Sequence, residues 1–261
     1  MRRFGKRTLL ALAVLAGLAG CGNALPPTRS AEAEIGLFTS LPILWRETGD
    51  VRELLASDAP PHWVQAVLAG RGRLRPLDTL ANESGAGISG TGIPGTLALD
   101  RRALLVMAQP RPLSPAENVS LDRWVRDGGR VLLFADPMLT AHSNFALGDA
   151  RRPQDIVLLS PILSRWGLEL RFDDTQSAGE RYVKVWKTTI PVDLPGSFAP
   201  RGTQQRCAFA GGGLAARCRV GQGEVIAIAD AAVLDGEVAD DALATRRDAV
   251  NHLLSLLAPA R

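Results

Sequence analysis

Short apolar runs, each ended by a turn-forming residue, recur along this chain. Uninterrupted runs of roughly four to eight apolar residues are typical of strands buried on both faces of a sheet. Between them, apolar residues recur at every third or fourth position, which indicates helices with one buried face. The predicted strands cover 34–40, 73–80, 103–108, 130–135, 168–172 and 223–230, and the predicted helices cover 51–56, 62–69, 115–127, 155–166 and 241–257.

The clearest unit lies in residues 103–137. After the first apolar run, Ser114-Pro115-Ala116-Glu117 supplies a helix N-cap, a proline at the first helical position and a glutamate at the third, which together form a capping box. Gly128-Gly129 ends the helix, and the next apolar run stops at Asp136-Pro137. A strand, a helix and a strand in such close succession form a βαβ unit, so these strands are predicted to be parallel.

The C-terminal third has a different pattern, because apolar and polar residues alternate from 182 to 192 and again around two cysteines. Alternation of this kind predicts antiparallel strands that are buried on one face. A hairpin turning at Gly212-Gly213 places Cys207 directly opposite Cys218, within the Cα separation of a disulfide. Two reduced, buried cysteines are the alternative.

Together these elements predict one α/β domain over residues 34–258, with a doubly wound, mostly parallel sheet. The antiparallel strands form a β insertion at about 180–221, before the last core strand.

Residues 1–20 have the features of an export signal. A basic start is followed by the apolar run Leu9–Ala19, which is shorter than the roughly 20 residues that cross a bilayer. The ending Leu18-Ala19-Gly20-Cys21 resembles the bacterial lipobox, in which the cysteine is acylated. Residues 21–33 would then be a tether to the membrane, on the periplasmic side of the envelope. An ordinary signal peptide cut near Ala24, with release to the periplasm, is the alternative.

Removal of this leader changes the charge balance. Four of the 30 basic residues lie in it, so 26 remain against 27 acidic residues, a net charge near −1. No basic stripe with interleaved aromatic residues is present, so nucleic acid is not an expected partner. The expected partner surface is the membrane, through the lipid anchor.

Motifs for cofactor, metal and nucleophile chemistry are weak. The G-x-G-x-x-G match at 85–90 is followed by Thr91-Gly92-Ile93-Pro94-Gly95, which does not begin a helix, so no dinucleotide site is expected. There is no phosphate-binding loop and no nucleophile elbow. His62, His142 and His252 lack the spacing of metal ligands. We therefore expect neither a cofactor nor a metal.

The remaining candidates are side chains that follow the predicted strands, because ligands of open α/β sheets bind outside the carboxyl ends of parallel strands. Asp136 beside His142 could orient a ligand or act as a general base. Asp136 as a simple turn former is equally consistent with the pattern, and for Asp230 that interpretation is favoured. The predicted ligand- or partner-binding residues are Ser40, Gln109, Arg111, Asp136 and His142.

The run Leu104–Pro137 resembles the extracytoplasmic domain of gliding-motility-type ABC-transport auxiliary proteins, and so do Pro161–Leu168, Gly221–Asp230 and Asn251–Leu254. The resemblance covers roughly residues 35–257 and implies a class I glutamine amidotransferase-like fold, with permease or ATPase subunits of a transporter as partners. The nucleophilic cysteine of the amidotransferases and their His-x-Glu partner have no counterpart, so glutaminase chemistry is not implied.

Three hypotheses for function follow. The leading one is a non-catalytic extracytoplasmic accessory or binding protein of an ABC transport system. The alternatives are an extracytoplasmic hydrolase that uses the Asp136 and His142 cluster, and a structural envelope lipoprotein.

Overall fold

A computed structural model describes residues 33–47, 61–81, 99–101, 103–202, 206–236 and 238–258. The described residues all belong to one compact unit, Ala33–Arg261. The predicted export signal, the tether up to Glu32, the helix at 51–56 and the glycine-rich motif at 85–90 lie outside the described residues.

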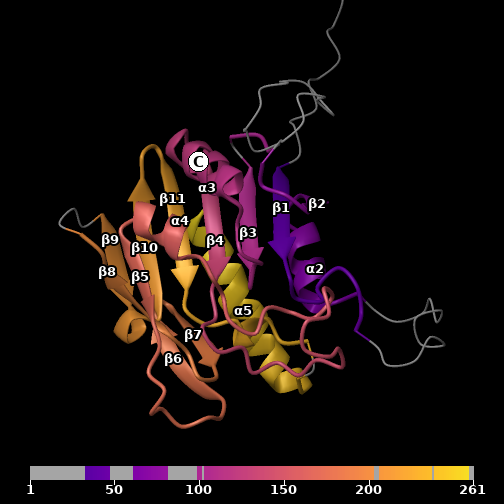
Figure 1. The fold of residues 1–261 in the computed structure, drawn as a ribbon. Helices are drawn as coiled ribbons and strands as arrows, with labels where there is room; N and C mark the ends of the chain where they lie inside the picture. The colour runs from indigo at the N-terminus through magenta and orange to yellow at the C-terminus, as the bar shows by residue number, and fades with distance from the viewer. Residues whose placement is uncertain are drawn as a thin grey trace, which may run out of the picture. The chain divides into compact units, whose positions relative to one another are not determined.

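A seven-stranded sheet forms the core, in the order β2-β1-β3-β4-β11-β10-β9 (Figure 1). Its first five strands are parallel, as predicted, and nearly all apolar residues of the four inner strands among them are buried because helices cover the sheet. These five are β1 (Glu34–Thr39), β2 (Arg73–Pro76), β3 (Leu104–Ala108), β4 (Arg130–Phe134) and β11 (Gly223–Ile228). The last two, β10 (Ala215–Val220) and β9 (Cys207–Ala210), are antiparallel.

Helices lie on both faces of this sheet, with α3 on the viewer's side and α5 behind it in Figure 1. The four described α-helices are α2 (Trp63–Ala69), α3 (Pro115–Arg126), α4 (Ser160–Arg165) and α5 (Asp240–Leu256). None of the described helices is long and apolar enough to cross a membrane.

The predicted capping box at the start of α3 is confirmed. Ser114 Oγ accepts a hydrogen bond from Glu117 N at 3.2 Å, and the Glu117 carboxylate accepts one from Ser114 N at 2.8 Å. The helix buries Trp124 over Gly129, where a Cβ atom would lie 2.3 Å from the indole ring. A glycine is therefore required there by space as well as by the end of the helix.

The helix predicted at 155–166 is shorter in the structure, where α4 starts at Ser160. The segment before it follows the end of β4 as an extended loop, because Val157 N donates a hydrogen bond to Asp136 O at 3.1 Å. A long-range backbone contact has replaced the local helical one.

The antiparallel strands predicted for the C-terminal third are present, and they are divided among three sheets. β5 (Leu168–Arg171) pairs with β8 (Ser197–Pro200), and β6 (Arg181–Val185) pairs with β7 (Thr188–Val192), each in its own small sheet. The hairpin β9–β10 instead widens the core sheet. Its predicted disulfide is confirmed, because Cys207 and Cys218 are register partners and are bonded, with Cα atoms 4.0 Å apart.

Candidate functional site

The chain changes direction across the sheet between β1 and β3. From β1 it moves to β2 on one side and then returns to β3 on the other, so β1 and β3 are neighbours whose connections diverge. In doubly wound sheets this switch point leaves a crevice at the carboxyl ends of the two strands, where ligands bind. Ser40 follows β1 and Gln109 follows β3, so both predicted residues lie at this point.

The side chain of Gln109 occupies the space at these strand ends. Its side chain is fully buried, and its Oε1 accepts a hydrogen bond from Asp136 N at 2.8 Å. Its Nε2 donates to Asp136 O at 3.1 Å and to Gln154 O at 2.7 Å. The amide therefore joins the ends of β3 and β4 to the loop that follows β4.

The backbone of Gln109 is strained, with a φ of 44°, in the left-handed region that costs a residue with a Cβ about 1 kcal/mol or more. A sharp strand-end turn of this kind is also how α/β-hydrolases expose a nucleophile. Here the residue on the turn carries an amide, which is a poor nucleophile, and its hydrogen-bonding atoms are already engaged.

Ser40 is hydrogen-bonded within the same group of residues. Its hydroxyl donates to Gln109 O at 2.5 Å and accepts from Gln154 N at 3.0 Å. The peptide groups on either side of Gln154 thus fill the place at which Ser40 and Gln109 would meet a ligand. Gln154 was not among the predicted residues, since no pattern in the sequence marks a loop residue that binds through its backbone.

Asp136 is also fully buried. Its two carboxylate oxygens accept hydrogen bonds from Met138 N at 2.8 Å and from Ala231 N at 3.1 Å. Burial raises the pKa of Asp136 to about 6, although these two hydrogen bonds act in the opposite direction. The turn interpretation accounts for the Met138 bond, while the Ala231 bond ties the end of β4 to the end of β11.

Asp230 lies beside it at the end of β11 and is equally buried. It accepts from Ala232 N at 2.6 Å and from Asp193 N at 3.0 Å. Burial, and then the neighbouring Asp136 carboxylate, raise its pKa well above the ordinary value. The negative charge of Asp136 therefore disfavours ionisation of Asp230.

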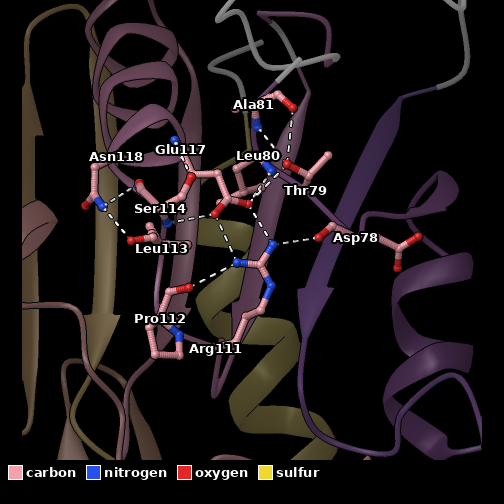
Figure 2. Close-up of polar contacts among 10 residues, drawn as sticks. All are labelled: Asp78, Thr79, Leu80, Ala81, Arg111, Pro112, Leu113, Ser114, Glu117 and Asn118. Atoms are coloured by element: carbon pink, nitrogen blue, oxygen red, sulfur yellow. Dashed lines mark hydrogen bonds and ion pairs between the residues drawn. The ribbon is translucent and has the colours of Figure 1, made fainter. Parts of the chain in front are cut away.

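Arg111 lies at the same end of the sheet but is bound to a different group (Figure 2). Both terminal nitrogens of its guanidinium donate to the carboxylate of Glu117, at 2.7 and 2.9 Å, and one also donates to Asp78 O. Glu117 in turn accepts from Leu80 N and Thr79 Oγ1, each at 3.1 Å. We refer to this group as the Glu117 hub.

The groups around Glu117 stabilise its negative charge. Burial raises the pKa of Glu117, but hydrogen bonds from Arg111, Ser114 N and Leu80 N outweigh it and lower the value to about 2. The capping box predicted a structural role for this glutamate, but its bonds to Arg111 and to the loop at 78–81 come only from the fold. The guanidinium of Arg111 is thereby committed to a neighbour in the same chain.

His142 is placed apart from these residues. It is exposed in the long loop 137–159, and within the described part of the chain no hydrogen bond or ion pair joins it to Asp136. For the Asp136 carboxylate and the His142 imidazole to act together, the two groups would have to lie within hydrogen-bonding reach of each other. The structure thus brings Ser40, Gln109 and Asp136 together and leaves Arg111 and His142 outside their network.

No group of three or more His, Cys, Asp or Glu side chains in the described ranges has the arrangement of a metal site.

Comparison with known proteins identifies the fold but not the activity. No protein-family model matches the sequence, and no curated protein matches it either. Among solved structures, the mmIFT52 N-terminal domain is similar, with 11% identity and a TM-score of 0.50, over 87% of this chain and 98% of that one. The cytoplasmic protein STM3548 from Salmonella typhimurium matches with 10% identity and a TM-score of 0.42, over 86% and 98% of the two chains.

A third similar structure is the exo-β-1,4-mannosidase Op5Man5 from Opitutaceae bacterium strain TAV5, with 13% identity and a TM-score of 0.44. The match covers 88% of this chain but only 35% of the mannosidase, so it concerns about a third of that enzyme. The chain has the class I glutamine amidotransferase-like fold, with a mostly parallel seven-stranded sheet and additional antiparallel strands in its C-terminal third.

Proposed function

We propose that this protein is a non-catalytic recognition domain, held outside the cytoplasm by an acylated Cys21, that serves as an accessory subunit of an ABC transport system. The observation that carries the proposal is the closed switch point. Ser40, Gln109 and Asp136 occupy the strand ends where this class of fold places its chemistry, and each is satisfied by groups of the same chain. Opening them to a substrate would leave buried polar groups unpaired, at about 1–3 kcal/mol each.

The surface above these strand ends has the character of a protein-binding face. Among the described residues, five of the seven exposed large apolar side chains lie on the loops that follow β1 and β4. Several exposed apolar side chains on two neighbouring loops favour a site of interaction. They are Trp45, Met138, Leu147, Ile156 and Leu158, with Leu147 the most exposed at 81%.

Side-chain contacts fix these two loops to each other, in addition to the hydrogen bond from Gln154 N to Ser40 Oγ. Trp45 and Phe145 have ring centroids 5.8 Å apart, and Glu47 accepts hydrogen bonds from Ser143 Oγ at 2.6 Å and Phe145 N at 3.1 Å. A face whose loops are already ordered loses less conformational entropy when a partner binds. This favours recognition of a protein over turnover of a small molecule.

The anchoring is tested by metabolic labelling with a fatty-acid analogue. The wild-type chain should be labelled and should need detergent for extraction, whereas Cys21→Ser should lose the label. An unlabelled wild-type chain would refute the lipid anchor.

The accessory role is tested by photo-crosslinking in native membranes, with benzoylphenylalanine at Leu147 and, as a control, at Arg123, which is exposed on α3. We expect a crosslink to a transporter permease from position 147 and none from position 123. Crosslinks from both positions, or turnover of ester, amide or glycoside substrates by the purified chain, would contradict the proposal.

A further inference from the structure

The chain uses lysine in a very restricted way. Outside the leader, which contains Lys6, the only two lysines are Lys184 and Lys187, and every other basic side chain is arginine. Both lysines lie on the hairpin β6–β7, one on β6 and one in the two-residue turn Trp186–Lys187. The two ammonium groups are therefore concentrated on one small element of the surface.

The hairpin has a buried face and an exposed face. Val183 and Val185 contact Gly211 beneath it, and Ile190 on β7 is fully buried. Side chains alternate along a strand, so Tyr182 and Lys184 point the opposite way and are exposed, Tyr182 by 53%. We call the exposed side chains Tyr182, Lys184 and Lys187 the lysine face.

Acidic residues next to the hairpin do not neutralise the lysine face. Glu180, which precedes β6, is bound by the buried Arg246 and by Tyr182 Oη. Asp193, which follows β7, accepts from Gly179 N at 2.8 Å. Neither lysine makes an ion pair within the described residues. An anionic partner would therefore meet two uncommitted cations.

The turn that presents Lys187 is strained, because Trp186 has a φ of 51°, a conformation that favours glycine. The Trp186 side chain packs against the hydrophobic core, which holds the turn in place. Strain that the surrounding structure maintains is characteristic of functional positions, and a rigid turn presents its side chain at a lower entropic cost on binding.

The position of the hairpin indicates which side of the protein the partner approaches. β7 ends beside the carboxyl end of β11, because Asp193 N donates to Asp230, so the hairpin lies at the carboxyl end of the sheet (Figure 1). The chain enters the domain at Ala33, at the amino end of β1. The lysine face therefore lies at the opposite end of the sheet from Ala33.

We infer that the lysine face docks an acidic segment of a partner protein, with two carboxylates against Lys184 and Lys187 and an apolar side chain against the ring of Tyr182. Lysine on an open strand edge also has a second use, since it prevents edge-to-edge pairing of sheets. That use requires no partner, and it predicts self-association when the lysines are removed.

The test measures binding of a fluorescein-labelled peptide of alternating Glu and Leu to the mature full-length chain by fluorescence anisotropy, at low and at physiological salt. The double variant Lys184→Gln/Lys187→Gln should raise the dissociation constant about tenfold, which corresponds to the loss of two ion pairs within the range of exposed pairs. Arg123→Gln/Arg247→Gln removes the same charge from exposed helical positions and should change it less than about twofold.

Four results would overturn the inference. Two concern the peptide assay: the wild-type chain does not bind the peptide, or the control pair of substitutions weakens peptide binding as much as the lysine pair does. The other two are lysine-dependent binding to phosphatidylglycerol vesicles in place of the peptide, and self-association of the lysine variant with unchanged peptide binding. Light scattering detects the last of these. Because the peptide assay does not involve the anchor or a transporter, its failure would leave the labelling and crosslinking results for the proposed function unaffected.

Discussion

Replacement of Glu117 by glutamine tests the electrostatic reasoning behind the Glu117 hub. The glutamate side chain is only 3% exposed and accepts from Arg111, Leu80 N, Thr79 and Ser114 N. Glutamine has one acceptor oxygen in place of two, and its amide nitrogen would direct hydrogens at donors. The variant should therefore lose the ion pair with Arg111 and leave at least one backbone N–H without a partner.

The magnitude follows from the pKa of Glu117, which is about 2 in the folded chain against an ordinary value of 4.5. A difference of this size corresponds to about 3 kcal/mol in favour of the folded state when the carboxyl group is ionised. The guanidinium of Arg111 is 42% exposed, so water screens part of the attraction. We expect Glu117→Gln to lower the free energy of unfolding by about 2–3 kcal/mol at neutral pH.

The pH dependence has a definite sign. Between pH 2 and about 4.5 the unfolded chain binds a proton at this residue and the folded chain does not, so the free energy of unfolding rises with pH across this window. The contribution is complete above the unfolded pKa and is lost as the pH falls through the folded pKa. Glu117→Gln should remove this part of the acid sensitivity.

Urea unfolding followed by tryptophan fluorescence at several pH values from 3 to 7 measures both effects. The control is Glu169→Gln, because Glu169 is a partly exposed glutamate paired with Arg171 at the surface, and its replacement should have little effect. If Glu117→Gln matched the wild type at neutral pH, or kept the full acid dependence, the assignment of Glu117 as the centre of this network would be wrong.

Further changes test other parts of the fold. Reduction of the disulfide Cys207–Cys218 opens a loop whose ends are 11 residues apart and should cost about 3 kcal/mol by chain entropy; mass spectrometry of unreduced peptides should show the two cysteines linked. Trp124→Ala should cost about 3–5 kcal/mol, because the ring is buried, whereas Ser114→Ala removes only a cap and should cost about 1 kcal/mol; equal losses in urea unfolding would contradict the packing of α3. Because the pKa of Asp136 is raised to about 6, the folded chain retains its proton longer than the unfolded chain, so stability should fall as the pH rises from about 4 to 6; the fall should be smaller in Asp136→Asn, and an unchanged slope would exclude this residue as a source.

Local patterns in the sequence determined the elements that depend on local physics. The apolar runs of β1, β3, β4 and β11 identified buried parallel strands, since only strands covered on both faces are apolar throughout. The capping box of α3 and the register of the Cys207–Cys218 hairpin were also evident, because a cap and a tight hairpin are set by neighbouring residues.

The tertiary structure decided whether the polar residues at the strand ends are free to bind a ligand. The sequence placed Ser40, Gln109, Arg111 and Asp136 at one end of the sheet, and the structure places them there. Their partners are backbone groups of Gln154, Met138 and Ala231 and the carboxylate of Glu117, and of these Gln154 and Ala231 are distant in the chain.

Backbone N–H and C=O groups are the same in every residue, so a sequence carries no mark of which one a buried side chain will bind. The helix predicted at 155–166 was too long for the same reason, since the bond of Val157 to the end of β4 depends on the packing of the whole loop. Whether a polar strand-end residue is free to bind a ligand is fixed only when the loops above the sheet are packed.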